Sequence, residues 1–260
     1  MNAELSRALL ELAGLTEAGL WTGLIVFLRI AALMALAPAF GEQAIPPRVR
    51  LALALAFTLV VAPAAPLGAV PRDGLPLLAL GGAELLTGIF LGLMLRLFVM
   101  VLQMAGTIAA QATSLSQIFG GTAGLDAMPA IGHILVVAGL ALATILGLHL
   151  RLAAYMIDSY ALIPPGQLPD PATIGAAGLD QVSRSFALAF TLAAPFVLAS
   201  LIYNITLGVI NRAMPQLMVA FVGAPAITFG SLALLLLAAP LMLPIWVQAM
   251  HAFLAAPFAP

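Results

Sequence analysis

Two residues of opposite charge lie inside long apolar stretches of this 260-residue chain. Arg29 lies eight residues after Trp21 in the first such stretch, and Glu84 lies eight residues after Pro76 in the third. A charge at the centre of a bilayer costs about 2.5 to 3.5 kcal/mol on insertion scales, so each charge needs a partner. If successive stretches alternate in direction, the first and third run the same way and place the two charges at similar depth. We therefore expect a buried Arg29–Glu84 pair that faces protein.

Two interpretations of this pair are open. It fixes the packing register of two helices, or it serves as a proton relay or substrate contact. Arg96 lies twelve positions after Glu84, which is about 18 Å along a helix. We expect its side chain to extend to the far membrane interface instead of joining the pair.

Other reactive residue types form no catalytic or metal-binding pattern. The three histidines His133, His149 and His251 stand apart, without an HExxH motif or a neighbouring acidic cluster. The serines lack a GxSxG nucleophile elbow, a nucleotide-binding loop is absent, and the chain has no cysteine. The sequence therefore predicts a protein that is not an enzyme and that needs no cofactor or metal.

The composition places the chain in a membrane. Hydrophobic residues make up 63% and charged residues only 7% of the sequence, with a mean hydropathy of +1.17. A soluble domain carries about 25% charged residues, so this chain cannot cover a water-exposed surface. The net charge is −1, which argues against nucleic acid as a partner and leaves membrane lipid as the surroundings.

Six segments are apolar and long enough to cross a bilayer as helices. They cover residues 21–40, 51–67, 75–104, 129–150, 184–211 and 227–250. The fold class is thus predicted to be all-α, a polytopic helical membrane protein. A short amphipathic segment over 1–18 is expected before a single membrane domain over 19–256, whose C-terminal part, 184–250, forms a helical hairpin.

Two connections differ from the rest in composition. Residues 105–126 are uncharged but rich in Gln, Thr, Ser and Gly, too polar for lipid and too apolar for open water, and we expect a loop there. Residues 151–183 contain Asp158, Pro164-Pro165-Gly166 and Pro171, and are expected to form a solvent-exposed hairpin and linker. Gly88 and Gly92 form a GxxxG motif that permits close helix approach in the third segment.

Four stretches, in this order and at this spacing, resemble the FliR family of type III secretion export-gate membrane proteins. The first begins at Phe27 with FLRIAALMALAPAFGEQAIPPRVR, and the others cover residues 82–117, 146–166 and 207–236. The resemblance implies a subunit of the flagellar export gate, through which unfolded flagellar proteins pass. It also implies a multi-pass protein of the bacterial inner membrane, located in the flagellar basal body.

The resemblance further implies the partners of the chain. These are FliP-like and FliQ-like membrane subunits, FlhB-type and FlhA-type export components, and the unfolded export substrates. The earlier helices are similar to a FliP subunit and the last two to a FliQ hairpin. A virulence-type injectisome subunit is the first alternative. The second is a small-solute transporter that uses Arg29 and Glu84 as its binding pair.

By position, the resemblance assigns roles to two groups of residues, a pore plug and the turn between the last two helices. The pore plug runs from Gln111 to Phe119 and includes Gln111, Thr113, Ser114, Leu115, Ser116, Gln117, Ile118 and Phe119. The glycines that follow, Gly120, Gly121 and Gly124, are flexible enough to act as a hinge for this segment. The turn between the last two helices contains Arg212, Pro215 and Gln216.

Overall fold

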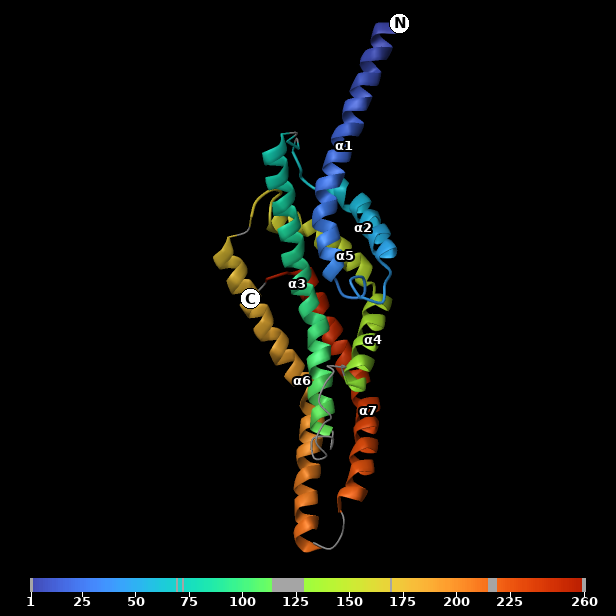
Figure 1. Cartoon of the computed structure of the whole chain (residues 1–260), viewed down its shortest axis with the longest axis vertical. Coiled ribbons are helices and arrows are strands. Elements are labelled where there is room, and N and C mark those ends of the chain that lie inside the picture. Colours follow the sequence, from blue (N-terminus) through green and yellow to red (C-terminus); the bar gives the residue numbers. More distant parts are fainter. Residues whose placement is uncertain are drawn as a thin grey trace. The chain divides into compact units, whose positions relative to one another are not determined.

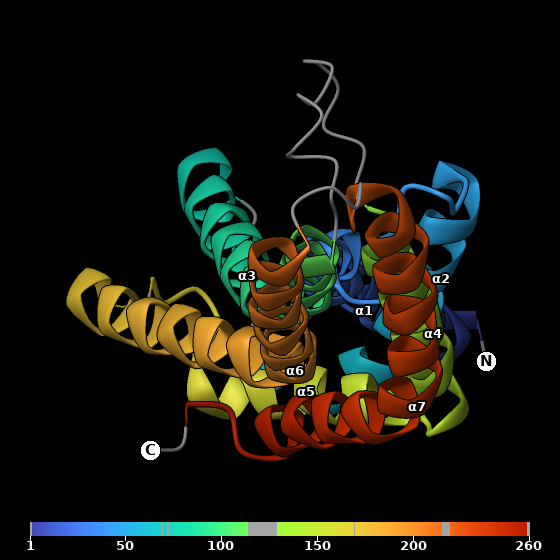
Figure 2. The same ribbon diagram turned by 90° about the horizontal axis from the view of Figure 1, so that it is seen from below.

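Helices make up the protein in the parts that the structure, a computed structural model, describes (Figures 1 and 2). These parts are residues 2–68, 70–71, 73–113, 129–168, 170–214 and 219–258, with only the backbone described for 2–16 and 219–225. The elements are α1 (Asn2–Leu36), α2 (Pro47–Val61), η1 (Ala62–Ala64), α3 (Gly74–Thr113), α4 (Ala130–Ile145), α5 (Leu148–Leu162), α6 (Pro171–Ala213) and α7 (Val219–Ala255). This confirms the predicted all-α fold class.

Five helices are long and apolar enough to cross a membrane. Their spans are Glu17–Leu36, Pro47–Ala64, Gly74–Thr113, Pro171–Ala213 and Ala226–Ala255. Helices α4 and α5 pass the same test only as a pair, because the helix breaks between them at Gly147, whose φ is +83°. Five or six spans agree with the predicted polytopic membrane protein.

The chain divides into two compact units. The first comprises Met1–Arg96, Gly147–Gly178 and Phe253–Pro260, and the second comprises Leu97–Leu146 and Leu179–Ala252. Within the first unit, α1 and α3 approach closely at Gly88, where an added Cβ atom would lie 2.3 Å from the Arg29 carbonyl oxygen. The close helix approach that the GxxxG motif permits is therefore present at Gly88. The single membrane domain over 19–256 stays a prediction.

Aromatic rings attach the end of the chain to the first unit. The Phe253 ring lies 6.1 Å from that of Tyr155 on α5 and 5.7 Å from that of Phe258. Phe258 in turn stacks on Phe90 of α3, with ring centroids 5.7 Å apart. Such offset and edge-on pairs stabilise beyond the apolar area they bury.

In the second unit, α3 packs against α4 and α7. An added Cβ atom on Gly106 of α3 would lie 2.1 Å from the Cα atom of Gly132 on α4, so the two backbones touch there. The fully buried Trp246 of α7 donates from Nε1 to the Phe98 carbonyl oxygen of α3 at 2.8 Å. This bond gives the indole N–H a partner inside an apolar core.

Two of the predicted connections are wrong in part. The loop predicted for 105–126 starts later, because α3 continues to Thr113. Residues 105–113 are rich in alanine, the strongest helix former. The hydroxyls of Thr107 and Thr113 donate to carbonyl oxygens four residues earlier, so these polar groups need no water.

The solvent-exposed hairpin and linker predicted for 151–183 is also wrong. Most of the segment is helical, since α5 extends to Leu162 and α6 begins at Pro171. A buried stripe on α5 contains Leu148, Leu152, Tyr155 and Ser159, at the spacing of one helix face. The charged and proline residues of the segment favoured a solvent-exposed prediction, so this buried stripe was not predicted. The segment predicted for 1–18 likewise continues without a break into the first span, as part of α1.

Candidate functional site

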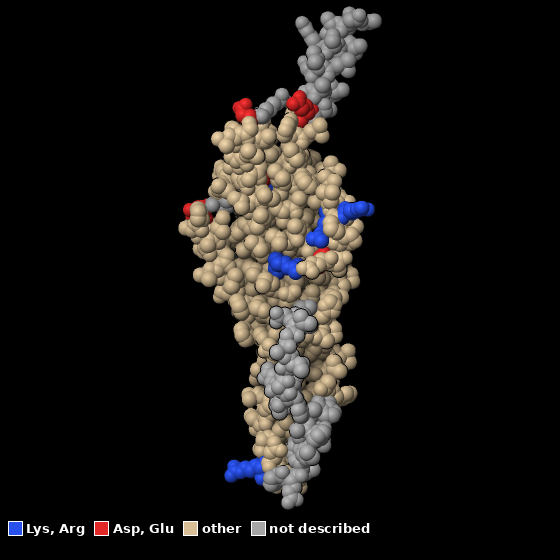
Figure 3. All heavy atoms as spheres, viewed as in Figure 1, with Lys and Arg blue, Asp and Glu red and all other residues tan. Residues whose placement is uncertain are grey.

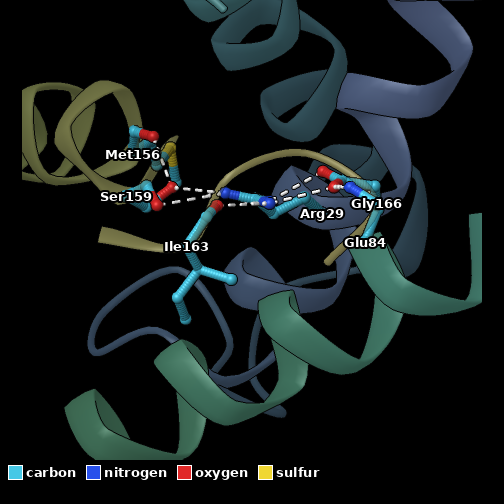
Figure 4. A network of polar contacts seen from close by, with 6 residues as sticks. All are labelled: Arg29, Glu84, Met156, Ser159, Ile163 and Gly166. Atoms are coloured by element: carbon cyan, nitrogen blue, oxygen red, sulfur yellow. Dashed lines mark hydrogen bonds and ion pairs between the residues drawn. The ribbon is translucent and has the colours of Figure 1, made fainter. Parts of the chain in front are cut away.

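The structure brings Arg29 of α1 and Glu84 of α3 together (Figure 4). Arg29 Nε donates to Glu84 Oε2 at 2.7 Å, and Nη2 donates to Oε1 at 2.9 Å. Both side chains are fully buried. This is the bidentate geometry in which the planar guanidinium fits a carboxylate best.

Every N–H of the Arg29 guanidinium has an acceptor. Besides the two bonds to Glu84, Nη1 donates to the carbonyl oxygen of Ser159 at 3.2 Å and to its Oγ at 3.3 Å. Nη2 also donates to the carbonyl oxygen of Ile163 at 3.1 Å. A guanidinium has five N–H groups, so no donor is left over for a ligand.

These bonds hold the C-terminal end of α5. The Ser159 carbonyl, which also accepts the Ile163 N–H, lies in the last turn of α5, and the Ile163 carbonyl lies just past the end of that helix. The positive charge of Arg29 is favourable there because it faces the negative end of the helix dipole. The Tyr160 ring lies beneath the guanidinium, with the ring centroid 3.9 Å from Cζ. Arg29 therefore connects α1, α3 and α5.

Glu84 holds the turn that follows α5. Its Oε1 atom accepts a hydrogen bond from the Gly166 N–H at 3.0 Å. Gly166 has a φ of +72°, a left-handed conformation that glycine adopts without strain. Its position leaves little room, because an added Cβ atom would lie 2.8 Å from Cδ1 of Leu80. Pro164 and Pro165 precede Gly166, and the Glu84 carboxylate accepts its N–H. Together they fix the turn.

The arrangement is suited to holding helices together and poorly suited to transfer. With all five donors of Arg29 occupied and the residue fully buried, Arg29 cannot bind a substrate without breaking the cluster. The geometry favours a structural tie over a proton relay or a substrate contact.

Arg96 has a partner that its sequence position did not suggest. Its Nη1 atom lies 2.7 Å from Oε1 of Glu42, in the connection between α1 and α2. The side chains are 29% and 23% exposed, so water screens this pair in part. Arg96 thus forms an ion pair with a residue of the connection between α1 and α2, and its place at the membrane interface stays a prediction.

A pocket lies beside the turn that Glu84 holds. It has a volume of about 400 Å³ and is lined by Leu67, Gly68, Val70, Pro71, Pro76, Ala79, Leu80, Pro165 and Gly166. None of these lining residues is titratable. No group of three or more His, Cys, Asp or Glu residues that could hold a metal occurs in the described part of the chain.

The residues assigned by resemblance are placed only in part. Gln111 is exposed on the last turn of α3, and Thr113 ends that helix with its side chain buried. Arg212 is exposed in the last turn of α6, where a positive charge is favourable. The remaining plug residues, Ser114 to Phe119, the hinge glycines Gly120, Gly121 and Gly124, and the turn residues Pro215 and Gln216 lie outside the described residues.

Sequence reasoning missed the partners that surround the ion pair. Ser159, Tyr160 and Gly166 come from a segment that was expected to face solvent. One signal could have found them: a buried guanidinium needs five acceptors, and Glu84 supplies only two. The remaining acceptors had to come from a helix end or a turn near the membrane-spanning helices.

Much of the exposed surface of the described residues is uncharged. On the face shown in Figure 3, most atoms belong to residues other than Arg, Lys, Asp or Glu. Large apolar side chains are exposed on α3, α6 and α7, among them Leu78, Phe190 and Phe229. Such a surface is suited to lipid or to neighbouring membrane proteins.

Comparison with known proteins gives one consistent result. Residues 20–253 match the family described as bacterial export proteins, family 1. The chain is 33% identical over 228 residues to the flagellar biosynthetic protein FliR of Caulobacter vibrioides, covering 85% of this chain and 90% of that one. It is 30% identical over 218 residues to FliR of Escherichia coli, covering 84% of each chain. FliR of Aquifex aeolicus is 29% identical over 228 residues, with 87% and 88% covered.

Proposed function

The chain belongs to family 1 of the bacterial export proteins, the family of FliR, and on this basis we propose that it is a subunit of the flagellar protein export gate. In this role it forms part of the membrane channel through which unfolded flagellar proteins leave the cell. The observation that carries the proposal is a match over residues 20–253, which includes most of every described membrane span.

The relatives support the flagellar system over the injectisome. The proteins compared above carry flagellar names, and they match at 29 to 33% identity over most of their length. We therefore propose a place in the flagellar basal body, within the inner membrane in which this multi-pass protein resides. The role is not enzymatic, so the energy for export has to come from other components.

The small-solute transporter receives little support from the ion pair. That alternative needs Arg29 or Glu84 to bind the solute. All five donors of Arg29 already bond to protein atoms, and both residues are fully buried. The pair is better explained as a tie that gives an export subunit a fixed shape.

The proposed partners are FliP-like and FliQ-like membrane subunits, together with FlhB-type and FlhA-type components. The last two helices, α6 and α7, supply a FliQ-like hairpin, and the earlier helices supply a FliP-like part. The apolar side chains exposed on α6 and α7, such as Phe190 and Phe229, are suitable for packing against neighbouring helices. Membrane lipid covers what the partners leave exposed.

We assign closure of the pore to residues 111–119. This assignment rests on the resemblance of that stretch to the plug of the family, with Gly120, Gly121 and Gly124 as its hinge. Deleting Ser114 to Phe119 should raise leakage of ions or small solutes through the assembled gate without preventing assembly. Normal assembly with unchanged leakage would remove the plug from the proposal.

A gene deletion tests the function itself. The deletion strain should lose motility and the export of flagellar proteins, and expression of the wild-type chain should restore both. A tagged chain purified from membranes should carry FliP-like and FliQ-like subunits with it. Normal export in the deletion strain, or a chain that purifies alone from mild detergent, would contradict the proposal.

A further inference from the structure

The C-terminal end of α3 is held by a polar contact from another helix. The described part of α3 extends to Thr113, and the carbonyls of residues 110–113 lie in its last described turn. The Ser200 hydroxyl of α6 donates to one of them, the carbonyl oxygen of Ala112. Both residues belong to the second compact unit, and Ser200 is buried.

A second polar residue supports this contact. Asn204, one turn after Ser200 on α6, donates from Nδ2 to Ser200 Oγ at 3.2 Å. The single hydrogen of the serine hydroxyl is committed to Ala112, so the amide group has to donate to the serine oxygen. Successive hydrogen bonds of this kind polarise and strengthen one another in a medium of low dielectric constant.

Ser200 differs from the other hydroxyl residues that bond within this helix. Ser185, Thr191 and Thr206 each donate to the carbonyl four residues earlier in α6. That is the usual choice for a hydroxyl in a helix, since it needs no partner elsewhere. Ser200 instead bonds across to α3.

The placement of Asn204 also argues against a passive role. Asn204 is exposed on an apolar helix that meets the length and composition of a membrane span. An amide facing lipid is unfavourable, so such a residue faces water or another protein. Polar side chains between membrane helices commonly act as specific contacts.

We infer that Ser200 and Asn204 are positioning residues, a polar latch that holds the last turn of α3 against α6, and that the proposed export function requires this latch. In the sequence, Ser200 is no nucleophile and Asn204-Ile205-Thr206 is a glycosylation sequon inside an apolar helix. The latch explains why both polar residues lie in that helix. It also places a fixed point immediately before residues 114–128.

Hydrogen–deuterium exchange on the assembly purified from membranes tests the latch directly. In Ser200→Ala, amide exchange over residues 109–113 should be faster by about three- to twentyfold, the range that interhelical hydrogen bonds in membrane proteins span. Asn204→Ala should give a smaller increase in the same residues. Ser200→Thr keeps the hydroxyl and should restore exchange close to wild type.

Ser185→Ala is the matched control. It makes the same substitution at another buried position of α6, where the hydroxyl bonds only to its own helix at Gln181. Its exchange over 109–113 should stay at the wild-type rate. If Ser200→Ala and Ser185→Ala exchange equally there, the latch is overturned, whatever the export measurements give.

Export rate and membrane leakage test the functional half. In the complemented deletion strain, Ser200→Ala should change one or both while the amount of assembled complex stays normal, and Ser200→Thr should rescue the change. Faster exchange with unchanged export and leakage would overturn the positioning role. Failure of the wild-type chain to restore export would instead refute the proposed function and leave the exchange result intact.

Discussion

The buried charges are the residues whose removal should cost most. Arg29 and Glu84 form hydrogen bonds with each other and also with a helix end and a turn. Breaking a buried pair by removing one partner leaves an uncompensated charge. Screened pairs near the surface contribute far less.

Replacing either charge alone should therefore be severe. Arg29→Met or Glu84→Gln should destabilise the protein by about 3 to 5 kcal/mol and reduce its amount in the membrane. The double variant should recover part of this loss, because no lone charge remains. Recovery stays incomplete because Ser159, Ile163 and Gly166 lose their partners. Immunoblots of membrane fractions and motility assays measure the effect.

The pair Arg96–Glu42 is the matched control for these variants. Its side chains are partly exposed, so Arg96→Met should cost only about 0 to 1 kcal/mol. Equal damage from the single and double variants at Arg29 and Glu84, with normal protein amounts, would mean that the charges act directly in export.

Asp170 should give a pH-dependent start to α6. Its Oδ2 atom accepts hydrogen bonds from the N–H and the hydroxyl of Thr173, both at 3.0 Å, and Pro171 follows at the first helical position. The bond from the Thr173 N–H lowers the pKa of the Asp170 carboxyl.

The pKa of the Asp170 carboxyl is lower in the folded protein than in the unfolded chain. The ionised carboxylate therefore stabilises the fold at pH values above the pKa in the unfolded chain, and this stabilisation is lost as the pH falls through the pKa in the folded protein. The protection of the first-turn amides of α6, taken relative to the intrinsic exchange rate at each pH, should thus fall as the carboxyl becomes protonated. Asp170→Asn keeps an acceptor and should remove this pH dependence of protection, while Asp170→Ala should show low protection at every pH. The same pH profile in Asp170→Asn as in wild type would assign the effect to another group.

At the scale of elements, close helix approach depends on particular glycines. Gly88 lies where the backbone of α1 meets α3, and its added Cβ atom would also come within 2.8 Å of the Ala32 Cβ atom. Because the nearest neighbour is backbone, no side-chain rotation relieves the contact. The two helices have to separate to accept a larger residue.

Gly88→Ala should therefore destabilise the protein by about 1 to 3 kcal/mol, as overpacking in a core does. Gly82→Ala on the same helix is the control, because an added Cβ atom there has nothing within 4 Å. That control should be neutral or slightly stabilising, since alanine favours helix more than glycine. Thermal unfolding of the purified proteins in detergent compares them, and equal melting temperatures would contradict the close approach.

At the scale of the whole molecule, much of the apolar surface stays exposed within the described part of the chain. Phe229 and Leu237 of α7 are 76% and 72% exposed, whereas Trp246 on the same helix is fully buried. Lipid alone could cover such side chains. The proposed FliQ-like neighbour would cover them with protein.

Photo-crosslinking should show whether lipid or a neighbouring protein covers these side chains. A crosslinking residue in place of Phe229 or Leu237 should capture a small membrane subunit in cells, because these side chains point away from the chain. The absence of cysteine also allows single-cysteine crosslinking as an independent check. Products with lipid alone, and none with protein, would count against the assembly.

The membrane character, the helical class and the pairing of two buried charges follow from the sequence by itself. Each depends on local quantities: hydropathy summed along about 20 residues, and the cost of a charge inside an apolar run. The spacing of Arg29 and Glu84 within their stretches sufficed to predict that they meet. Family membership followed from the order and spacing of four stretches, because both are properties of the sequence.

Only the tertiary structure decided what surrounds those residues. Arg29 bonds to Ser159 and Ile163, 130 and 134 residues further along, and Ser200 bonds to Ala112 across 88 residues. The composition of residues 151–183 predicted a solvent-exposed segment. One face of α5 is buried instead, because this segment supplies hydrogen-bond acceptors to Arg29 on α1. Local patterns cannot report such contacts, because the free energy of a buried polar group depends on partners that folding brings from distant parts of the chain.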